Sequence, residues 1–269
     1  CGSTPAHIQA MGQAFVSRQP VLPPPSLNSS LPTFLTSRSR SIALGAQELP
    51  LLIGERLNPT ARKVVAQALR QADWDFIIRE GAAQLEAGAP LLDLNTGLPG
   101  ADESQLLPTA VQHLQMALDC PLVLDCTKPA ALERGLQEFH GRALINSVNG
   151  EAASLNSILP LAKKYGAAVL GLTLNEQGIP EKAEDRLKIA EQIVAAALSY
   201  GLLREDILID CLALTAATSP EAARETLRAI ALVKSQLGVN TVLGLSNVSH
   251  GLPQRSWLNA SFLALALGA

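Results

Sequence analysis

Residues 241–253 read T-V-L-G-L-S-N-V-S-H-G-L-P, an apolar run that passes directly into a polar loop. Residues 241–245 are too few for a helix, include β-branched side chains and follow the turn residue Gly238, so they predict a buried strand. Ser246 and Asn247 come immediately afterwards. A strand whose end carries hydroxyl and amide groups offers hydrogen bonds to a ligand rather than to its own core.

The same arrangement recurs along the chain, where short apolar runs alternate with amphipathic segments of helical periodicity. The predicted strands are residues 51–54, 90–94, 122–125, 143–145, 168–172, 207–209 and 241–245. The predicted helices are residues 75–87, 103–118, 130–139, 153–165, 182–199, 220–237 and 255–267. This alternation is typical of a parallel α/β sheet with right-handed crossovers. So long a series predicts a (β/α)8 TIM barrel that lacks its last strand in this chain, with an open doubly wound sheet as the alternative.

The segment before the barrel has a different composition. Residues 1–17 open with C-G-S-T-P and continue as a short amphipathic helix, which predicts the tail of a preceding domain. Residues 18–47 begin with five prolines among serines, which indicates an extended linker, and end in two short runs, 33–37 and 41–45, that predict a capping hairpin. The barrel domain is therefore expected over residues 48–269.

Composition limits the function classes. The 269 residues are 48% hydrophobic, enough for a sizeable core, and the net charge of −3 with 3% aromatic residues argues against nucleic-acid binding. Apolar runs fall short of the roughly 20 residues that span a bilayer, so we expect no membrane association. The four cysteines form neither a CxxC pair nor a disulfide framework, which favours a reducing, cytoplasmic setting.

Polar residues follow every predicted strand, and in a parallel barrel these positions form one active-site face. They include Glu55, Arg56, Asn58, Asp93, Asn95, Asp125, Thr127, Asn146, Ser147, Asn149, Thr173, Asn175, Asp210, Ser246, Asn247 and Ser249. A carboxylate accepts two parallel N–H bonds from a 2-amino-4-oxo pyrimidine edge, and carboxamides match the remaining ring atoms. A single aspartate after a strand is usually a helix cap. Three aspartates at equivalent places, Asp93, Asp125 and Asp210, favour a binding site instead. The sequence therefore predicts a pocket for a neutral, donor-rich heterocycle.

Other reactive residue types have simpler interpretations. Cys126 and Cys211 follow aspartates and are expected to be small packed residues rather than nucleophiles. His7, His113 and His140 show no metal-ligand spacing and are expected at the surface or at helix ends. Trp74 and Trp257 are expected to pack in the fold or at an interface.

Seven motifs in order resemble the pterin-binding methyltransferase family, which includes methyltetrahydrofolate:corrinoid methyltransferases and the folate-binding domains of cobalamin-dependent methionine synthases. They are G-E-R-L-N-P-T (54–60), L-D-L-N-T-G (92–97), L-D-C-T (124–127), A-L-I-N-S-V-N-G-E (143–151), G-L-T-L-N-E-Q-G-I-P (171–180), I-D-C-L (209–212) and G-L-S-N-V-S-H-G-L-P-Q-R-S (244–256). The opening C-G-S-T-P-A-H-I-Q-A-M looks like the end of the homocysteine-binding domain that precedes the folate domain in methionine synthases. The resemblance covers roughly residues 48–269.

The resemblance implies a substrate and a set of site residues. Asp125, Asn146 and Asp210 would hold the pterin ring of 5-methyltetrahydrofolate, and Asn247 would reach its N5 atom. The wider pterin set would contain Asp93, Asn95, Asn58 and Ser246.

The resemblance also implies partners. The N5-methyl group would pass to cob(I)alamin carried by a separate cobalamin-binding domain, during methionine synthesis from homocysteine. Cys1 would be one zinc ligand of the complete upstream homocysteine-binding domain. A dihydropteroate synthase-like enzyme and a non-catalytic folate-binding or docking module are the alternatives. The first needs cations for a pyrophosphate, whereas the loop after the seventh strand carries Ser246, Asn247 and Ser249.

Overall fold

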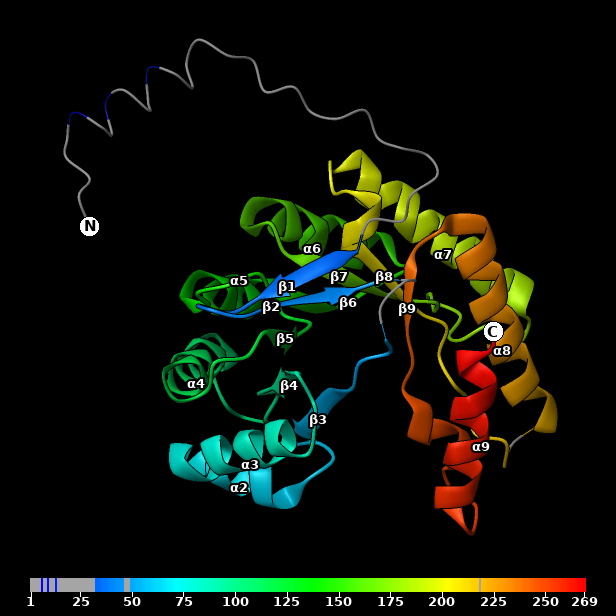
Figure 1. Ribbon diagram of the computed structural model, residues 1–269, viewed down its shortest axis with the longest axis horizontal. Coiled ribbons are helices and arrows are strands. Elements are labelled where there is room, and N and C mark those ends of the chain that lie inside the picture. Colours follow the sequence, from blue (N-terminus) through cyan, green and yellow to red (C-terminus); the bar gives the residue numbers. More distant parts are fainter. Residues whose placement is uncertain (1–5, 7–8, 10–12, 14–31, 46–48, 218) are drawn as a thin grey trace.

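A computed structural model describes residues 6, 9, 13, 32–45, 49–217 and 219–269. Most of the predicted N-terminal tail, including Cys1, and most of the predicted linker lie outside the described residues. The described chain consists of a β-hairpin, a curved parallel sheet and an outer layer of helices (Figure 1). Within this part of the chain, the helices are too short or too polar to cross a bilayer.

The sheet has seven strands that follow one another in chain order, and each pair of neighbours is parallel. They are β3 (Ile53–Leu57), β4 (Leu91–Asn95), β5 (Leu122–Asp125), β6 (Leu144–Asn149), β7 (Ala168–Leu172), β8 (Ile207–Asp210) and β9 (Asn240–Val242). This order confirms the seven-stranded, barrel-like sheet predicted from the sequence. The doubly wound alternative is wrong, because such sheets reverse their strand order at a switch point.

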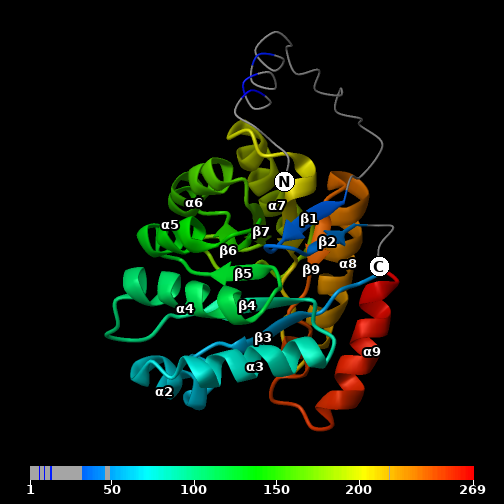
Figure 2. The ribbon, with the colours of Figure 1, turned by 60° about the vertical axis from the view of Figure 1, so that its left-hand side comes forward.

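The helices surround the strands in an arc that runs from α2 and α3 to α9 (Figures 1 and 2). They are α2 (Lys63–Gln71), α3 (Trp74–Glu86), α4 (Glu103–Ala117), α5 (Pro129–Glu138), α6 (Ala152–Tyr165), α7 (Ala183–Ser199), α8 (Pro220–Leu237) and α9 (Arg255–Leu267). Two 3-10 turns, η1 (Arg204–Asp206) and η2 (Leu245–Ser249), precede β8 and α9.

Several local features differ from the prediction, and one is that strand β6 runs to Asn149 instead of ending at residue 145. The sequence pattern does not predict helix α2, because its nine residues are too few for a clear helical periodicity. Its buried Val65 and Leu69 do have helical spacing. Strand β3 begins two residues late and includes Glu55 and Arg56. Strand β9 ends at Val242, because the chain turns at Gly244 into η2 instead of extending to residue 245.

Two apolar cores lie on opposite faces of the sheet. Leu91, Val123 and Leu144 pack together on the inner, concave face, whereas Leu92 and Leu124 pack against the helices. Successive strand residues point to opposite faces, so a residue two positions beyond an inner-face leucine also points inward. On β4, β5, β6 and β8 this inner core fills the start of the strand, and the inward-pointing side chains beyond it decide the chemistry of the opposite end.

The predicted hairpin is present, as β1 (Thr33–Thr36) and β2 (Ser41–Leu44), and it closes the base of the sheet. Its Leu35 is completely buried in the inner core. Thr36 and Arg142 exchange main-chain hydrogen bonds of 3.1 Å just before β6. Asn240 at the start of β9 donates to Thr33 Oγ1 and to the carbonyl of Leu44, each at 3.0 Å. The hairpin therefore leaves the carboxyl ends of the strands as the accessible mouth.

Candidate functional site

Acids and amides occupy the inner face of the sheet at the carboxyl ends of the strands. Asp93 and Asn95 alternate with outward-facing leucines on β4, two and four positions after Leu91. The strand register places Asn95 opposite Asp125 and Asp125 opposite Asn146. The inner apolar layer is thus followed directly by a polar layer that spans three neighbouring strands.

Cross-strand hydrogen bonds order this polar layer. Asn95 Nδ2 donates to Asp125 Oδ2 at 2.8 Å, and Asn146 Nδ2 donates to Asp93 Oδ1 at 3.1 Å. Asn95 Oδ1 accepts from the main-chain N–H of Gly97 at 2.8 Å. The structure therefore brings these four predicted site residues together in two hydrogen-bonded pairs, and the charge of Asp125 acts on Asp93 of the other pair.

The carboxyl groups of these pairs hold protons more tightly than exposed acids do. Burial, followed by the negative charges of Asp125 and Glu55, raises the pKa of Asp93 to about 7, although the hydrogen bond from Asn146 opposes the shift. Burial also raises the pKa of Asp125, with Asn95 opposing it. Raised carboxyl pKa values are typical of functional sites, because a binding pocket places acids where water does not solvate them.

Asp210 ends β8, and its side chain is fixed by the main chain of the next turn. Its Oδ1 accepts from the N–H of Leu212 at 2.7 Å, and the N–H of Gly244 also donates to this carboxylate. Burial raises the pKa of Asp210 to about 6, while these two hydrogen bonds and the charge of Arg186 lower it. The carbonyl of Asp210 accepts from the N–H and hydroxyl of Thr173, each at 3.1 Å.

Arg186 on α7 is a buried cation beside this acid that the sequence pattern alone did not single out. Its side chain is fully buried, and Nη1 donates to the carbonyls of Cys211 and Leu212 and to Thr226 Oγ1, each at 3.0 Å. Arg186 therefore fixes the turn that holds Asp210. Its position between the buried Ala183 and Ala190, on the apolar stripe of α7, was the available sequence signal.

The loop with Asn247 lies against the same turn. A Cβ atom at Gly244 would stand 3.0 Å from Asn247 Nδ2, so the carboxamide lies over the residue whose N–H binds Asp210. Asn247 is exposed and Ser246 is half-buried. Arg255 fixes the loop to α9, because it donates to the carbonyl of Ser246 and to Ser249 Oγ, each at 3.0 Å.

Asn58 has a local structural role. Its Oδ1 accepts from the N–H groups of Thr60 at 2.9 Å and Ala61 at 3.3 Å, which makes it the first residue of the turn that leads to α2. A contact from Asn58 to a ligand stays a prediction.

The two cysteines that follow site aspartates are packed residues, as expected. Cys126 and Cys211 are buried, and burial raises the pKa of each thiol to about 12, far from the value a nucleophilic cysteine needs. Among the described residues, no group of three or more His, Cys, Asp or Glu side chains is arranged to hold a metal ion.

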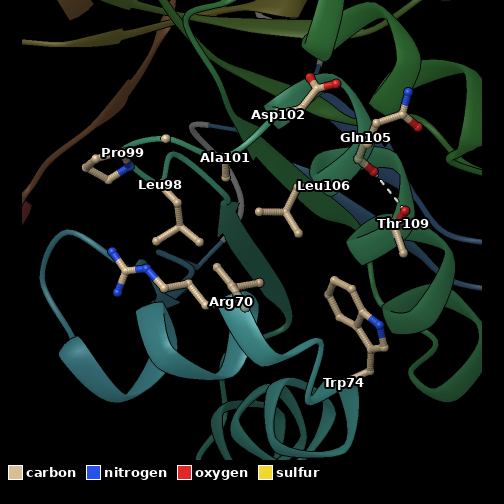
Figure 3. Close-up of a pocket in the computed structure, with 11 residues that line it drawn as sticks. Arg70, Trp74, Leu98, Pro99, Ala101, Asp102, Gln105, Leu106 and Thr109 are labelled. Carbon is tan, nitrogen blue, oxygen red and sulfur yellow. Dashed lines mark hydrogen bonds between the residues drawn. The ribbon is translucent and has the colours of Figure 1, made fainter.

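A cavity of about 500 Å³ lies on the helix-covered side of the sheet (Figure 3). Its walls come from α2, the start of α3, the loop before α4 and α4 itself, with Arg70, Trp74 and Leu106 among the lining residues. Trp74 stacks on His113 with ring centroids 4.8 Å apart, which confirms its expected packing role. We place the candidate site at the strand ends, because the acids with raised pKa values converge there.

Comparison with known protein families gives a match over most of the chain. The sequence model of pterin-binding enzymes matches residues 54–269, which include every strand of the parallel sheet except the first residue of β3. The chain belongs to the pterin-binding enzyme family.

Relatives within this family include methyltransferases. Methionine synthase from Mycobacterium tuberculosis is 33% identical over 98% of this chain, but the chain spans only 23% of that relative's length. Methylcorrinoid:tetrahydrofolate methyltransferase from Eubacterium limosum is 29% identical, and the match covers 81% of each chain. The chain is thus a pterin-binding domain related to the folate-binding modules of methionine synthases.

Solved structures with the same fold include dihydropteroate synthases. The enzyme from Xanthomonas albilineans in complex with 7,8-dihydropteroate has a TM-score of 0.63 and 17% identity, over 87% of this chain and 89% of that chain. The enzyme from Yersinia pestis has a TM-score of 0.61 and 16% identity, over 87% and 88% of the two chains. At these identities the likeness concerns the fold alone.

Proposed function

We propose that the chain binds 5-methyltetrahydrofolate at the mouth of its sheet and presents the N5-methyl group for transfer to cob(I)alamin on another domain. The convergence of Asp125, Asn146 and Asp210 on one concave face is the observation that carries the proposal. Asp125 on β5 and Asp210 on β8 are three strand spacings apart, about 14 Å along the curved sheet. A bicyclic ring with N–H groups on opposite edges is a suitable ligand for two carboxylates on different strands of one mouth.

The relatives support the choice of reaction. The methyltransferase from Eubacterium limosum is named for a corrinoid and tetrahydrofolate, and it matches this chain over most of both lengths. We therefore assign the chain to the methyltransferases, with the methyl group moving between N5 of the folate and cobalt. The cob(I)alamin partner supplies the nucleophile, and the residues of this chain supply binding, orientation and help for the leaving nitrogen.

Asn247 is the residue we assign to the leaving nitrogen. As the methyl group departs, N5 keeps the electron pair of the broken C–N bond and becomes a good leaving group only with a proton or a strong hydrogen bond. A carboxamide does not titrate near neutral pH, but it donates to N5 or to a water molecule bound there, and its oxygen can later accept from N5–H. Its exposed position over Gly244 suits this role. Such a bond strengthens in the transition state.

The proposed context is that of a methionine synthase, with a homocysteine-binding domain before this chain and a cobalamin-binding domain elsewhere. The matches to methionine synthases over 98% of the chain support it. In that setting Cys1, which lies outside the described residues, would be one of the three or four ligands that a zinc site needs.

Dihydropteroate synthase activity is the enzymatic alternative, since several solved structures of this fold are named for that activity. It requires cations at the strand ends for a pyrophosphate. The guanidinium of Arg255, at the start of α9, is already bonded to Ser246 and Ser249 of the loop after β9. This arrangement favours the methyltransferase.

The test uses the purified chain in two measurements. Calorimetric titration with 5-methyltetrahydrofolate is expected to show one site, and single-turnover mixing with free cob(I)alamin is expected to show methylcobalamin formation by absorbance. Binding without transfer would favour the non-catalytic module. Condensation of a dihydropterin pyrophosphate with 4-aminobenzoate would favour the synthase, and absence of any folate binding would overturn the proposal.

A further inference from the structure

A buried acid and an exposed cation form an ion pair beside the hydrogen-bonded pair of Asn95 and Asp125. Lys128 Nζ lies 3.3 Å from Glu103 Oε2, and only 7% of the Glu103 side chain is exposed. Glu103 is the first residue of α4, whereas Lys128 directly precedes α5 and follows Asp125 by three residues. The Lys128 side chain is 63% exposed, so solvent reaches the cation but not the acid with which it pairs.

Glu103 approaches the site from behind Gly97. A Cβ atom at Gly97 would lie 3.2 Å from Asn95 Oδ1 and 3.9 Å from Glu103 Oε1, so the two oxygens lie close to one point. Asn95 in turn donates to Asp125 Oδ2 at 2.8 Å. Burial, and to a lesser extent the charge of Glu103, raise the pKa of the Cys126 thiol, and Cys126 directly follows Asp125. The Glu103 carboxylate is therefore a close neighbour of Asp125 that stands outside the polar layer itself.

Asp125 is surrounded by more negative than positive charge. The charged groups near it are Asp93 on β4, Glu55 on β3, which acts on Asp93, Glu103 on α4 and Lys128 before α5, while β6 contributes the uncharged Asn146. Burial raises the pKa of Asp125, the hydrogen bond from Asn95 opposes the shift, and the charge of Glu103 adds to it. Like charges at short range disfavour ionisation.

The state of Asp125 decides what it can offer a ligand. An ionised carboxylate accepts hydrogen bonds through both oxygens, whereas a protonated one places a donor on one of them. Lys128 compensates the charge of Glu103 and so lowers the electrostatic cost of a second carboxylate at Asp125. Without this cation Glu103 would be a buried charge with no partner at that position, and such a charge acts strongly on its neighbours.

We propose that the Glu103–Lys128 ion pair keeps Asp125 in the acceptor form that a pterin requires, with Lys128 acting through Glu103 and not by contact with the ligand. Lys128 is thus a positioning residue. The inference rests on the proposed function, because it takes Asp125 as a partner of the pterin ring. It adds two residues to the site that the polar layer at the strand ends does not contain.

A direct contact is the rival explanation for any effect of Lys128, since an exposed lysine at the mouth can also bind the carboxylates of a folate tail. The first experiment separates the two with a pair of ligands. Calorimetry at pH 7 measures the affinity for 5-methyltetrahydrofolate and for 6-methyltetrahydropterin, which lacks the 4-aminobenzoyl-glutamate tail. Lys128→Met is expected to weaken both ligands by the same factor, about threefold or more, which corresponds to about 0.7 kcal/mol. Lys128→Arg keeps the charge and is expected to match wild type. A loss confined to the ligand with the tail would overturn the inference.

The second experiment removes the charge that Lys128 compensates. In a Glu103→Gln chain, the further change Lys128→Met is expected to alter affinity by less than about 1.5-fold, because the two residues act as a coupled pair. The same loss with and without Glu103 would show that Lys128 acts on its own, which contradicts the proposal.

The pH dependence of binding gives a further readout. Affinity for a ligand that needs ionised Asp125 falls as the pH falls through the pKa of this carboxyl group. Loss of Lys128 raises that pKa, so the affinity of Lys128→Met is expected to begin to fall at a higher pH than that of wild type. Asp93 and Asp210 titrate in both proteins, so the difference between the two profiles is the quantity to compare. Coincident profiles would overturn the inference.

Lys164→Met is the matched control. Lys164 is a similarly exposed lysine that pairs with Glu133 at 2.6 Å, between α5 and α6 and away from the polar layer. It is expected to change neither the affinity nor the pH profile, and an effect as large as that of Lys128→Met would contradict the proposal. If wild type bound neither ligand, the proposed function itself would fail, whereas additive effects of Glu103 and Lys128 in a chain that binds both would overturn this inference alone.

Discussion

The N–H of Leu212 donates to Asp210 Oδ1 at 2.7 Å from a residue whose φ is 58°. Leucine rarely adopts this left-handed conformation, which costs roughly 1 kcal/mol or more. The carbonyl of the same residue accepts from Arg186 Nη1 at 3.0 Å, so a buried cation and a site carboxylate hold the strained residue from its two ends. The strained conformation of Leu212 therefore fixes the direction of the Asp210 carboxylate, which we assign to the edge of the pterin ring.

Substitution of Asp210 tests that assignment. In Asp210→Asn one acceptor oxygen becomes an NH2 group, which must then face either a main-chain N–H or an N–H of the pterin. We expect the binding free energy of 5-methyltetrahydrofolate to weaken by about 2–4 kcal/mol, with the fold retained. Calorimetry measures the affinity and circular dichroism the fold. Unchanged affinity would give Asp210 a purely structural role.

Arg186→Met tests the support behind Asp210. The substitution keeps a long apolar stem but leaves the carbonyls of Cys211 and Leu212 without their buried donor, so we expect the free energy of unfolding to fall by about 2–4 kcal/mol. Folate affinity should fall too, since the Asp210 turn loosens. Arg224→Met, which removes an exposed ion pair with Glu221, is the control and should change stability by less than about 0.5 kcal/mol. Equal effects of the two variants would contradict the assigned role.

Asn247→Ala separates rate from binding. We expect methyl transfer to cob(I)alamin to slow by about 10²-fold, comparable to the loss of one oriented polar group in an active site. Folate affinity should change much less, because the bond to N5 strengthens only as the methyl group leaves. Single-turnover kinetics and a titration on the same variant measure both quantities. Equal losses would show that Asn247 only helps to seat the pterin.

The raised pKa of Asp93 predicts how stability depends on pH. Between its ordinary pKa near 4 and its folded value of about 7, the folded state binds the proton more tightly than the unfolded state does. The contribution of Asp93 to the stability of the folded state is therefore complete at low pH and is lost as the pH rises through 7.

The free energy of unfolding of Asp93→Asn, relative to that of wild type, should therefore rise by about 2 kcal/mol between pH 5 and pH 8. Denaturant unfolding without ligand measures it. Glu133→Gln is the control, because Lys164 lowers the pKa of that exposed carboxyl and its titration lies below this range. A difference between Asp93→Asn and wild type that does not vary with pH would refute the prediction.

Gly141→Ala tests the attachment of the hairpin. A Cβ atom at this position would overlap the carbonyl oxygen of Thr36, which is bonded to the N–H of Arg142. We expect a loss of about 1–3 kcal/mol in the free energy of unfolding. Gly268→Ala should be close to neutral, since its Cβ would make only ordinary contacts of 3.6 Å or more. A lower melting temperature for Gly141→Ala alone is the expected result.

The strands and the acids at their ends could be predicted from the sequence because both depend on local pattern. Buried apolar runs predict parallel strands, and the residue that ends such a run lies at the mouth of a curved sheet. This pattern predicts the positions of Asp125 and Asp210. Arg186 could not be assigned in this way, since its partners are carbonyls 25 and 26 residues away that only the folded chain brings near. The pairing of Asn146 with Asp93 likewise depends on strand register rather than on sequence spacing.

The hairpin at the base has a consequence for ligand binding at the opposite end. It is bonded to Asn240 at the start of β9, to Arg142 before β6 and, through Ser37, to Asp119 before β5. The strands that carry Asp125 and Asn146, and the strand that leads to the Asn247 loop, therefore share one anchor. Their separation at the mouth is set before a ligand arrives, so little conformational entropy is lost on binding and more of the hydrogen-bond energy appears as affinity.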